Sequence, residues 1–330
     1  MIKAGMSGAR INTAYCSFED YDKRIEEVRN EENKLDVKIP IMMDIKGPQL
    51  RILTADPNVN YSIKQGIVFP LGFYEDSKEL KSSSDTDIFL NYNIKDEIKE
   101  GDTILIENGT IATRVLENNG NLYVQVLNQG DGIIKNNMGV NVPGRYLDLP
   151  HLSMKDEQVI DYALKNNLDY IALSFVRDGK DLTYLQDYII NKKVELGLDN
   201  KVGLIAKIED KFGCLNFNDI IKKADKDNFD FEIMIARGDL FNEVNYSKLA
   251  HIQQYIGEIC HKENVPFMIG TGLLESMKYN SRPSRAEIGD VWNALRDKPN
   301  SFLLSAETSN GKNPILAVNT LKRIIDDYCI

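Results

Sequence analysis

The sequence predicts an α/β fold, in which helices cover a parallel sheet and a small β domain interrupts the chain. From residue 147 onward, short apolar runs alternate with stretches whose apolar residues recur at helical spacing. This alternation is typical of repeated βα units, whose strands are buried on both faces. Between about residues 50 and 140, polar and apolar residues alternate instead and Asn-Gly turn signals appear, which indicates a small antiparallel β structure.

The expected core strands are seven apolar runs, in chain order 8–12, 39–44, 170–175, 202–208, 231–236, 266–271 and 301–305. A closed TIM (β/α)8-type barrel has eight parallel strands. Residues 1–6 resemble the end of a helix, so we expect a barrel of this type that is N-terminally truncated by about one strand. The helices also carry local signals, because Ser153 and Asp156 predict a capping box before an amphipathic stretch.

The change of pattern divides the chain into three parts. Residues 1–49 are expected to form the first part of the barrel, 50–140 an inserted β lid domain, and 141–330 the remainder of the barrel. Hairpin turns are predicted at 107–109 and 118–120. An inserted domain over the catalytic end of a barrel suits a lid, although the pattern alone fits a spacer equally well.

The composition excludes several classes of protein. The 40 basic and 50 acidic residues give a formal net charge of -10, which argues against a nucleic-acid binder. No apolar run approaches the ~18 residues of a membrane span, and the N-terminus lacks a secretory signal, so we expect a cytoplasmic protein without membrane contact. The four cysteines have no CxxC spacing, which argues against a zinc knuckle or a disulfide framework.

Polar residues close the apolar strands, and in a barrel these strand ends share one rim, where active sites are assembled. Any one of them alone is better explained by helix capping or solvent exposure, but together they predict a site. The residues are Asp44, Lys207, Glu209, Arg237, Asp239, Thr271, Ser305 and Glu307.

The spacing within this set fits phosphate or enolate chemistry. Lys207 and Glu209 are two residues apart on one strand, so their side chains point the same way, either as a structural ion pair or as part of a site. Glu209 and Asp239 follow adjacent strands and could hold Mg²⁺, which takes one or two carboxylates together with water and substrate oxygens. Arg10 shares a strand face with Asn12, and a guanidinium beside a lysine and a metal suits a phosphate.

Several segments together resemble one known family, the pyruvate kinases, in order and spacing. The matching segments are AGMSGARIN, MDIKGPQLR, MGVNVPG, LDLPHLSMKD, SFVR, AKIED, ARGDL, TGLLESM, RPSRAE and LSAETSNG. The resemblance implies a phosphotransferase of glycolysis that moves the phosphoryl group of phosphoenolpyruvate to ADP, giving pyruvate and ATP.

The resemblance also implies how the substrate is held. Arg10 would contact the substrate phosphate, and Lys207 would act catalytically by stabilising charge on the transferring phosphoryl group. Gly238 and Thr271 would bind the carboxylate end of the substrate, with Asp239 beside them.

The same resemblance implies a metal site and a nucleotide contact. Glu209 and Asp239 would ligate Mg²⁺ or Mn²⁺, and Arg51 would reach the phosphates of ADP or ATP. Ser305 and Glu307 are further candidates without an assigned role.

Asn12, Asp44 and Ile45 correspond to the monovalent-cation site of the family. Ala14 and Ile45 stand where the family usually has a serine and a threonine, so two hydroxyl ligands are absent. Gln49 replaces the glutamate common in K⁺-dependent members, which removes a negative charge that a cation would balance. The sequence therefore predicts weak or absent activation by K⁺.

Two other functional hypotheses are compatible with the sequence. The first is a catalytically weak or inactive pyruvate-kinase-like protein, since fold alone does not establish turnover. The second is a metal-dependent carbon–carbon lyase acting on pyruvate, which explains the carboxylates but not the large insertion or the arginines. The expected partners are phosphoenolpyruvate, ADP or ATP, and pyruvate; a homo-oligomer is compatible with the family, and the sequence leaves the oligomeric state open.

Overall fold

The computed structural model describes residues 1–14, 16–74, 86–107, 109–118, 122–128 and 130–328. These residues form two compact units. The barrel unit comprises residues 1–47, 151–238 and 247–330, and the β unit comprises 48–150 with 239–246. The short segment 239–246, which the sequence pattern assigned to the barrel, is thus grouped with the β unit.

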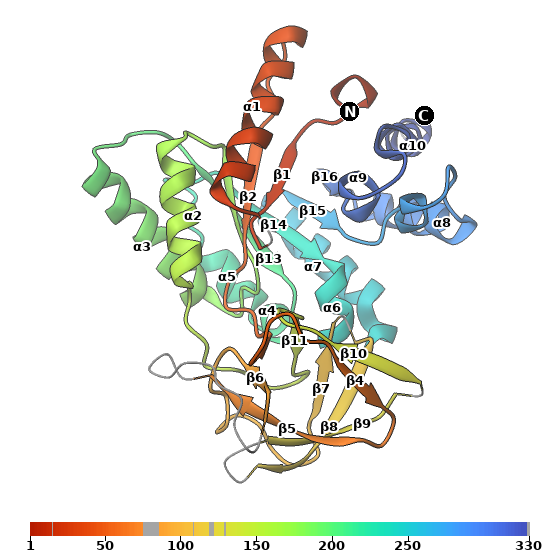
Figure 1. Ribbon diagram of the computed structural model, residues 1–330. Helices are drawn as coiled ribbons and strands as arrows, with labels where there is room; N and C mark the ends of the chain where they lie inside the picture. The colour runs from red at the N-terminus through yellow and green to blue at the C-terminus, as the bar shows by residue number, and fades with distance from the viewer. Residues whose placement is uncertain (15, 75–85, 108, 119–121, 129, 329–330) are drawn as a thin grey trace. The chain divides into compact units, whose positions relative to one another are not determined.

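The barrel unit is built on one curled parallel sheet of seven strands (Figure 1). In spatial order the strands are β1 (Ala9–Asn12), β2 (Ile41–Ile45), β12 (Tyr170–Leu173), β13 (Gly203–Ile208), β14 (Phe231–Ala236), β15 (Phe267–Gly270) and β16 (Ser301–Leu303). All seven strands expected from the sequence are confirmed. Among the described residues, β1 pairs only with β2 and β16 only with β15, so these two strands are the edges of the sheet.

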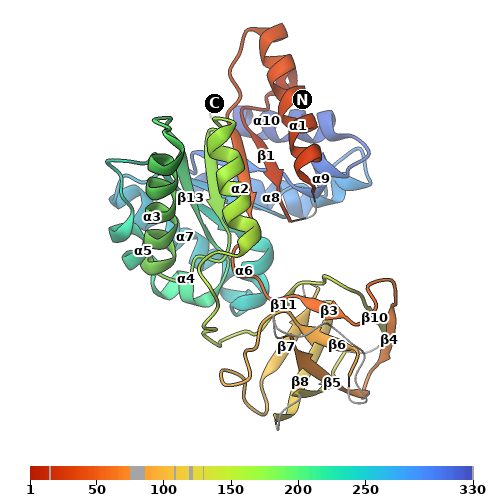
Figure 2. The ribbon, with the colours of Figure 1, turned by 60° about the vertical axis from the view of Figure 1, so that its left-hand side comes forward.

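Ten α-helices and three 3-10 helices are present in the described part of the chain. They are α1 (Phe18–Leu35), α2 (Met154–Lys165), α3 (Gly179–Leu196), α4 (Lys211–Leu215), α5 (Phe217–Lys223), α6 (Arg237–Glu243), α7 (Leu249–Lys262), α8 (Arg285–Arg296), α9 (Ala306–Ser309), α10 (Pro314–Tyr328), η1 (Ile2–Ala4), η2 (Tyr246–Lys248) and η3 (Glu275–Lys278). Figure 2 shows α2, α3 and α5 side by side against one face of the sheet. The predicted capping box at Ser153 and Asp156 is confirmed. None of the described helices combines the length and the apolar character that crossing a membrane requires.

The parallel strands are apolar on both faces because both faces are covered. Every residue of β13 is buried, and so are all residues of β2 and β15. Alternate residues point to an inner cluster formed by Met42, Ala172, Ile205, Met234, Ala236 and Met268. The edge strand β16 differs, since all three of its residues are only partly buried. The core is therefore tightest in the middle of the sheet.

The β unit has its own sheets and its own core. Its strands are β3 (Ile52–Thr54), β4 (Tyr61–Lys64), β5 (Val68–Phe73), β6 (Ile88–Leu90), β7 (Thr103–Ile106), β8 (Ile111–Asn118), β9 (Leu122–Val126), β10 (Asp131–Ile134) and β11 (Val140–Asn141). One sheet has the order β11-β7-β8-β9-β5-β6-β3, and β10 pairs with β4 in a second. The pairings are antiparallel except between β5 and β6, and they include the expected β7–β8 and β8–β9 hairpins. In the predicted turns, Asn108 and residues 119–120 lie outside the described residues.

Candidate active site

A buried lysine lies at the centre of a charged cluster at the carboxyl ends of β2, β12 and β13. The Lys207 ammonium donates hydrogen bonds to Ser174 Oγ at 2.6 Å and to Asp44 Oδ1 at 2.9 Å. It also forms an ion pair with Glu209 Oε1 at 3.2 Å. Lys207 is 6% exposed, and Asp44 and Glu209 are each 3% exposed. A lysine is buried this deeply only when partners compensate its charge, and here two carboxylates do so.

The register of the first two strands brings a second cation to the same carboxylate. Asn12 on β1 lies opposite Asp44 on β2, and Arg10, two residues earlier, points the same way as Asn12. Arg10 Nε donates to Asp44 Oδ2 at 2.6 Å. The Arg10 side chain is 23% exposed, so it reaches from the buried cluster toward solvent. A guanidinium in this position is accessible to an anionic ligand.

The ionic states of the cluster support one another. Burial by itself would raise the pKa of Asp44, but the charges of Lys207 and Arg10 and their hydrogen bonds hold it below its ordinary value. Burial would likewise lower the pKa of Lys207, yet Asp44 and Glu209 raise it above the usual range. Lys207 therefore stays protonated and Asp44 ionised at neutral pH.

Glu209 offers the kind of oxygen that a hard divalent cation prefers. Its Oε2 accepts a hydrogen bond from the backbone N–H of Phe175 at 2.8 Å, which fixes the carboxylate at the end of β13. Asp239 lies in the first turn of α6, directly after the neighbouring strand β14. No group of three or more His, Cys, Asp or Glu side chains suited to a metal occurs among the described residues. Mg²⁺ needs only one or two carboxylates, and a site formed by Glu209 and Asp239 stays a prediction.

Gly238 and Thr271 lie together at the ends of β14 and β15. A Cβ atom on Gly238 would come within 3.0 Å of Thr271 Cγ2, so the threonine side chain packs directly over the glycine. Arg237 binds the backbone carbonyl of Thr271. The two residues that the family resemblance pairs as substrate contacts are therefore neighbours.

Glu307 contacts backbone rather than other side chains of the set. It is 1% exposed, and its carboxylate accepts hydrogen bonds from the N–H groups of Ser305 at 3.0 Å and Leu274 at 3.4 Å. Ser305 precedes α9 and makes no side-chain capping bond to it. This arrangement ties the loop after β15 to the loop after β16.

The residues of the expected monovalent-cation site form hydrogen bonds and ion pairs with other residues of the chain. Asn12 Oδ1 accepts the N–H of Ala14 at 3.0 Å. The side chain of Ile45 is fully buried, and its carbonyl accepts the N–H of Ser174 at 3.3 Å. Each carboxylate oxygen of Asp44 is bonded to a cationic side chain, as described above. The positive charge next to Asp44 thus comes from the side chains of Arg10 and Lys207.

Arg51 lies in the β unit and is 4% exposed. Its guanidinium donates to the carbonyl of Asn137 at 2.7 Å and to Gln49 Oε1 at 2.5 Å. These bonds hold it within the β unit, and its contact with nucleotide phosphates stays a prediction.

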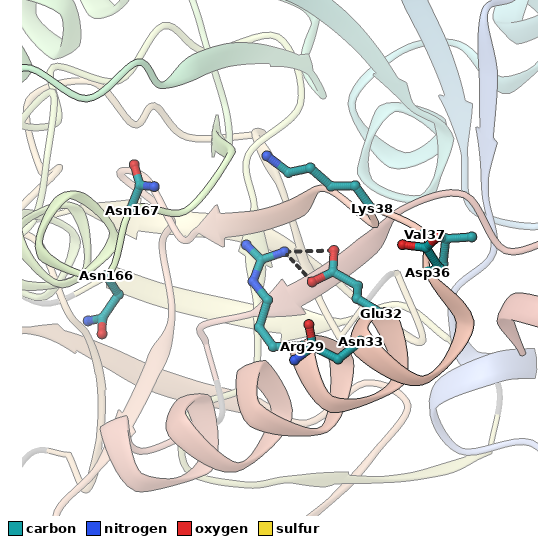
Figure 3. Close-up of a pocket in the computed structure, with 8 residues that line it drawn as sticks. All are labelled: Arg29, Glu32, Asn33, Asp36, Val37, Lys38, Asn166 and Asn167. Atoms are coloured by element: carbon teal, nitrogen blue, oxygen red, sulfur yellow. Dashed lines mark hydrogen bonds and ion pairs between the residues drawn. The ribbon is translucent and has the colours of Figure 1, made fainter.

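A polar pocket of about 620 Å³ lies at the other end of the sheet (Figure 3). It is lined by Arg29, Glu32, Asn33, Asp36, Val37, Lys38, Asn166 and Asn167. Lys38 and Asn167 precede β2 and β12, so the pocket lies at the amino ends of these strands, where barrel active sites are not found. Its cations are paired internally, because Arg29 and Lys38 both form ion pairs with Asp169.

Sequence reasoning missed two contributors to the cluster. Ser174 closes the apolar run of β12, so the same strand-end signal that identified Asp44 would have found it. Phe175 contributes only its backbone N–H, which donates to Glu209 Oε2 from a residue with a φ of +54°. No side-chain pattern reports such a donor.

Comparisons with known proteins agree with this geometry. Residues 1–318 match the family model described as pyruvate kinase, barrel domain. The pyruvate kinase of Kluyveromyces lactis is 35% identical over 323 residues, and that of Mycoplasma pneumoniae is 32% identical over 326 residues. A crystal structure of a pyruvate kinase from Cryptosporidium parvum superposes with a TM-score of 0.88 at 32% identity and covers 100% of the chain.

The match extends over nearly all of this chain but over only part of its relatives. It includes 97% of the chain and 61% of the Kluyveromyces lactis protein, 98% and 62% for Mycoplasma pneumoniae, and 66% of the Cryptosporidium parvum chain. The chain thus spans about three fifths of the length of these curated relatives. The matched part contains the whole parallel sheet and every residue of the charged cluster, and on this basis the chain belongs to the pyruvate kinase family.

Proposed function

We propose that the chain transfers the phosphoryl group of phosphoenolpyruvate to ADP and so forms pyruvate and ATP, as a phosphotransferase of glycolysis in the cytoplasm. The observation that carries this proposal is the buried, protonated Lys207 beside Arg10 at the carboxyl ends of the strands. Two cations at this rim suit a substrate whose reacting group is a phosphate. Asp44 and Glu209 offset the charge of Lys207 before any substrate binds.

In the proposed reaction a terminal phosphate oxygen of ADP forms a bond to phosphorus while the bond between phosphorus and the enol oxygen breaks. Arg10 holds the phosphate, and Lys207 offsets the charge that spreads over the transferring group. The enolate left behind is then protonated to pyruvate. Gly238 and Thr271 hold its carboxylate end.

Glu209 and Asp239 are the proposed ligands of Mg²⁺ or Mn²⁺. Both provide carboxylate oxygens, and both lie directly after neighbouring strands. When bound, the divalent ion supplies charge neutralisation for phosphate oxygens. Arg51 is the proposed contact to the nucleotide.

The direct test is an assay of the purified chain with phosphoenolpyruvate, ADP and MgCl₂, followed by pyruvate formation. Steady pyruvate release that requires both substrates supports the proposal. Calorimetric binding of phosphoenolpyruvate without turnover would overturn it in favour of a catalytically inactive relative.

We expect Glu209→Gln to raise the Mg²⁺ concentration needed for half-maximal activity by at least about tenfold, because the amide removes a charged ligand. The amide oxygen can still accept the bond from Phe175, and Lys207 keeps Asp44 as a carboxylate partner, so the fold should persist. The measurement is a Mg²⁺ titration of initial rate. Glu195→Gln, an exposed glutamate on α3, is the matched control. An unchanged Mg²⁺ dependence would remove Glu209 from the metal site.

We expect replacement of K⁺ by Na⁺ or tetramethylammonium to change the steady-state rate by no more than about twofold. Arg10 and Lys207 already supply positive charge at Asp44, and Ala14 offers no hydroxyl ligand. Ala14→Ser should increase the response to K⁺, since it returns one ligand. A strong K⁺ requirement in the unmodified chain would contradict this prediction.

A further inference from the structure

Arg237, the residue directly after β14, binds the backbone of Thr271 at the end of the neighbouring strand. Its Nε and Nη2 both donate to the Thr271 carbonyl oxygen, at 3.1 and 2.9 Å. The side chain is 9% exposed. Two donors on one rigid planar group fix the direction of the carbonyl, which a lysine could not do.

Thr271 has a backbone conformation that needs such support. Its φ is +74°, in the left-handed region that a β-branched residue rarely enters. A conformation of this kind costs about 1–3 kcal/mol and persists only where the surroundings hold it. Here it places the threonine side chain over Gly238.

The guanidinium is itself held by Asp290 and Gln253. Nη1 lies 3.1 Å from Asp290 Oδ1, and Nη2 lies 2.9 Å from Asp290 Oδ2, so the pair is bidentate. Gln253 on α7 accepts a longer bond from Nη1 at 3.4 Å and donates to Asp297 at 2.7 Å. Asp290 lies on α8, so Arg237 connects this helix with the end of β15.

We propose that Arg237 is a positioning residue that sets Thr271 for the carboxylate end of the substrate, with Asp290 holding the guanidinium in place. The inference rests on the proposed function. Arg237 is buried and its charge is met by Asp290, so it acts through the Thr271 backbone and not by touching substrate. Its removal therefore weakens catalysis only as far as Thr271 contributes to it.

A double-mutant cycle tests this dependence. In the otherwise unmodified chain, Arg237→Lys lowers kcat/KM for phosphoenolpyruvate by about 10²-fold, the size expected from a small misplacement of a positioned group. The KM for ADP does not change. In the Thr271→Ala background, the same Arg237→Lys substitution changes kcat/KM by less than about threefold, because the group it positions is absent.

Asp290→Asn provides a second variant, since Asp290 is 44% exposed and its replacement is easily accommodated. It gives a smaller loss that also disappears in the Thr271→Ala background. Arg296→Lys, at an exposed position on the same helix, is the matched control and leaves the rate unchanged. Thermal unfolding of every variant separates misfolding from misplacement.

Equal losses from Arg237→Lys in both backgrounds, or a parallel rise in the KM for ADP, would overturn the positioning role while leaving the kinase activity intact. Absence of turnover in the unmodified chain would overturn the proposed function and this inference with it.

Discussion

Lys207→Met is expected to reduce pyruvate formation by at least about 10²–10³-fold, the cost of removing one preorganised charge from a phosphoryl-transfer site. Methionine occupies a similar volume but carries no charge and no donor. The variant loses the bonds to Ser174 and Asp44 and the ion pair with Glu209. The measurement is kcat at saturating phosphoenolpyruvate, ADP and Mg²⁺.

The same substitution is expected to destabilise the fold. Glu209 loses its ion pair with Lys207, and Asp44 keeps Arg10 as a cationic partner and the hydrogen bond from Ser174. Breaking a buried ion pair on one side costs about 3–5 kcal/mol. Activity is therefore measured well below the unfolding transition, which is determined separately for each variant. Lys201→Met is the control, because Lys201 is exposed and precedes the same strand at its amino end. Near-normal turnover by folded Lys207→Met would refute the role of the lysine.

Gly47→Ala is expected to lower the free energy of unfolding by about 2–5 kcal/mol. Gly47 follows β2 with a φ of +61°, and a Cβ atom there would lie 2.3 Å from the carbonyl oxygen of Ser174. That contact is with backbone, so no side-chain rotation relieves it. Because Ser174 also binds Lys207, the displacement should lower activity as well as stability.

Gly197→Ala separates the two causes of this loss. Gly197 ends α3 with a nearly equal φ of +65°, but a Cβ atom there would meet nothing within 4 Å. Its replacement should lower the free energy of unfolding by only about 1–2 kcal/mol, the cost of a left-handed backbone conformation for alanine. Activity should not change. Urea unfolding followed by circular dichroism compares the two. Equal shifts for both variants would show that the clash with Ser174 is relieved by movement.

The sequence predicts the strands of this fold well because the central strands are buried on both faces and are bounded by turns. It also predicts that Asp44, Lys207, Glu209 and Thr271 belong to one rim, since parallel strands end on the same side. The sequence does not predict which of the rim side chains bind one another. Asp44 was expected at a cation site from the family resemblance, but its bonds to Arg10 and Lys207 depend on distances across three strands that no spacing along the chain encodes.

The contacts made by backbone groups cannot be predicted from the sequence either. The Phe175 N–H that fixes Glu209 and the Thr271 carbonyl held by Arg237 are present at every residue of any sequence. These two groups differ from other backbone groups only in the local conformation of the chain and in the side chains that the neighbouring strand ends bring close to them. The sequence predicts Arg237 as a strand-end polar residue, but its contacts with Thr271 and Asp290 depend on the packing of elements far apart in the chain.

The rim residues should differ in local stability, because some of them lie at the end of a central strand and others follow an edge strand. Lys207 lies in β13 and Glu209 directly follows it, and β13 has paired strands on both sides, so these amides should open to hydrogen exchange only in near-global unfolding. Ser305 and Glu307 follow β16, which is bonded on one side only among the described residues and is partly exposed along its length. Low-energy fluctuations should therefore reach the loop after β16, which Glu307 ties to the loop after β15, while Lys207 and Glu209 stay fixed.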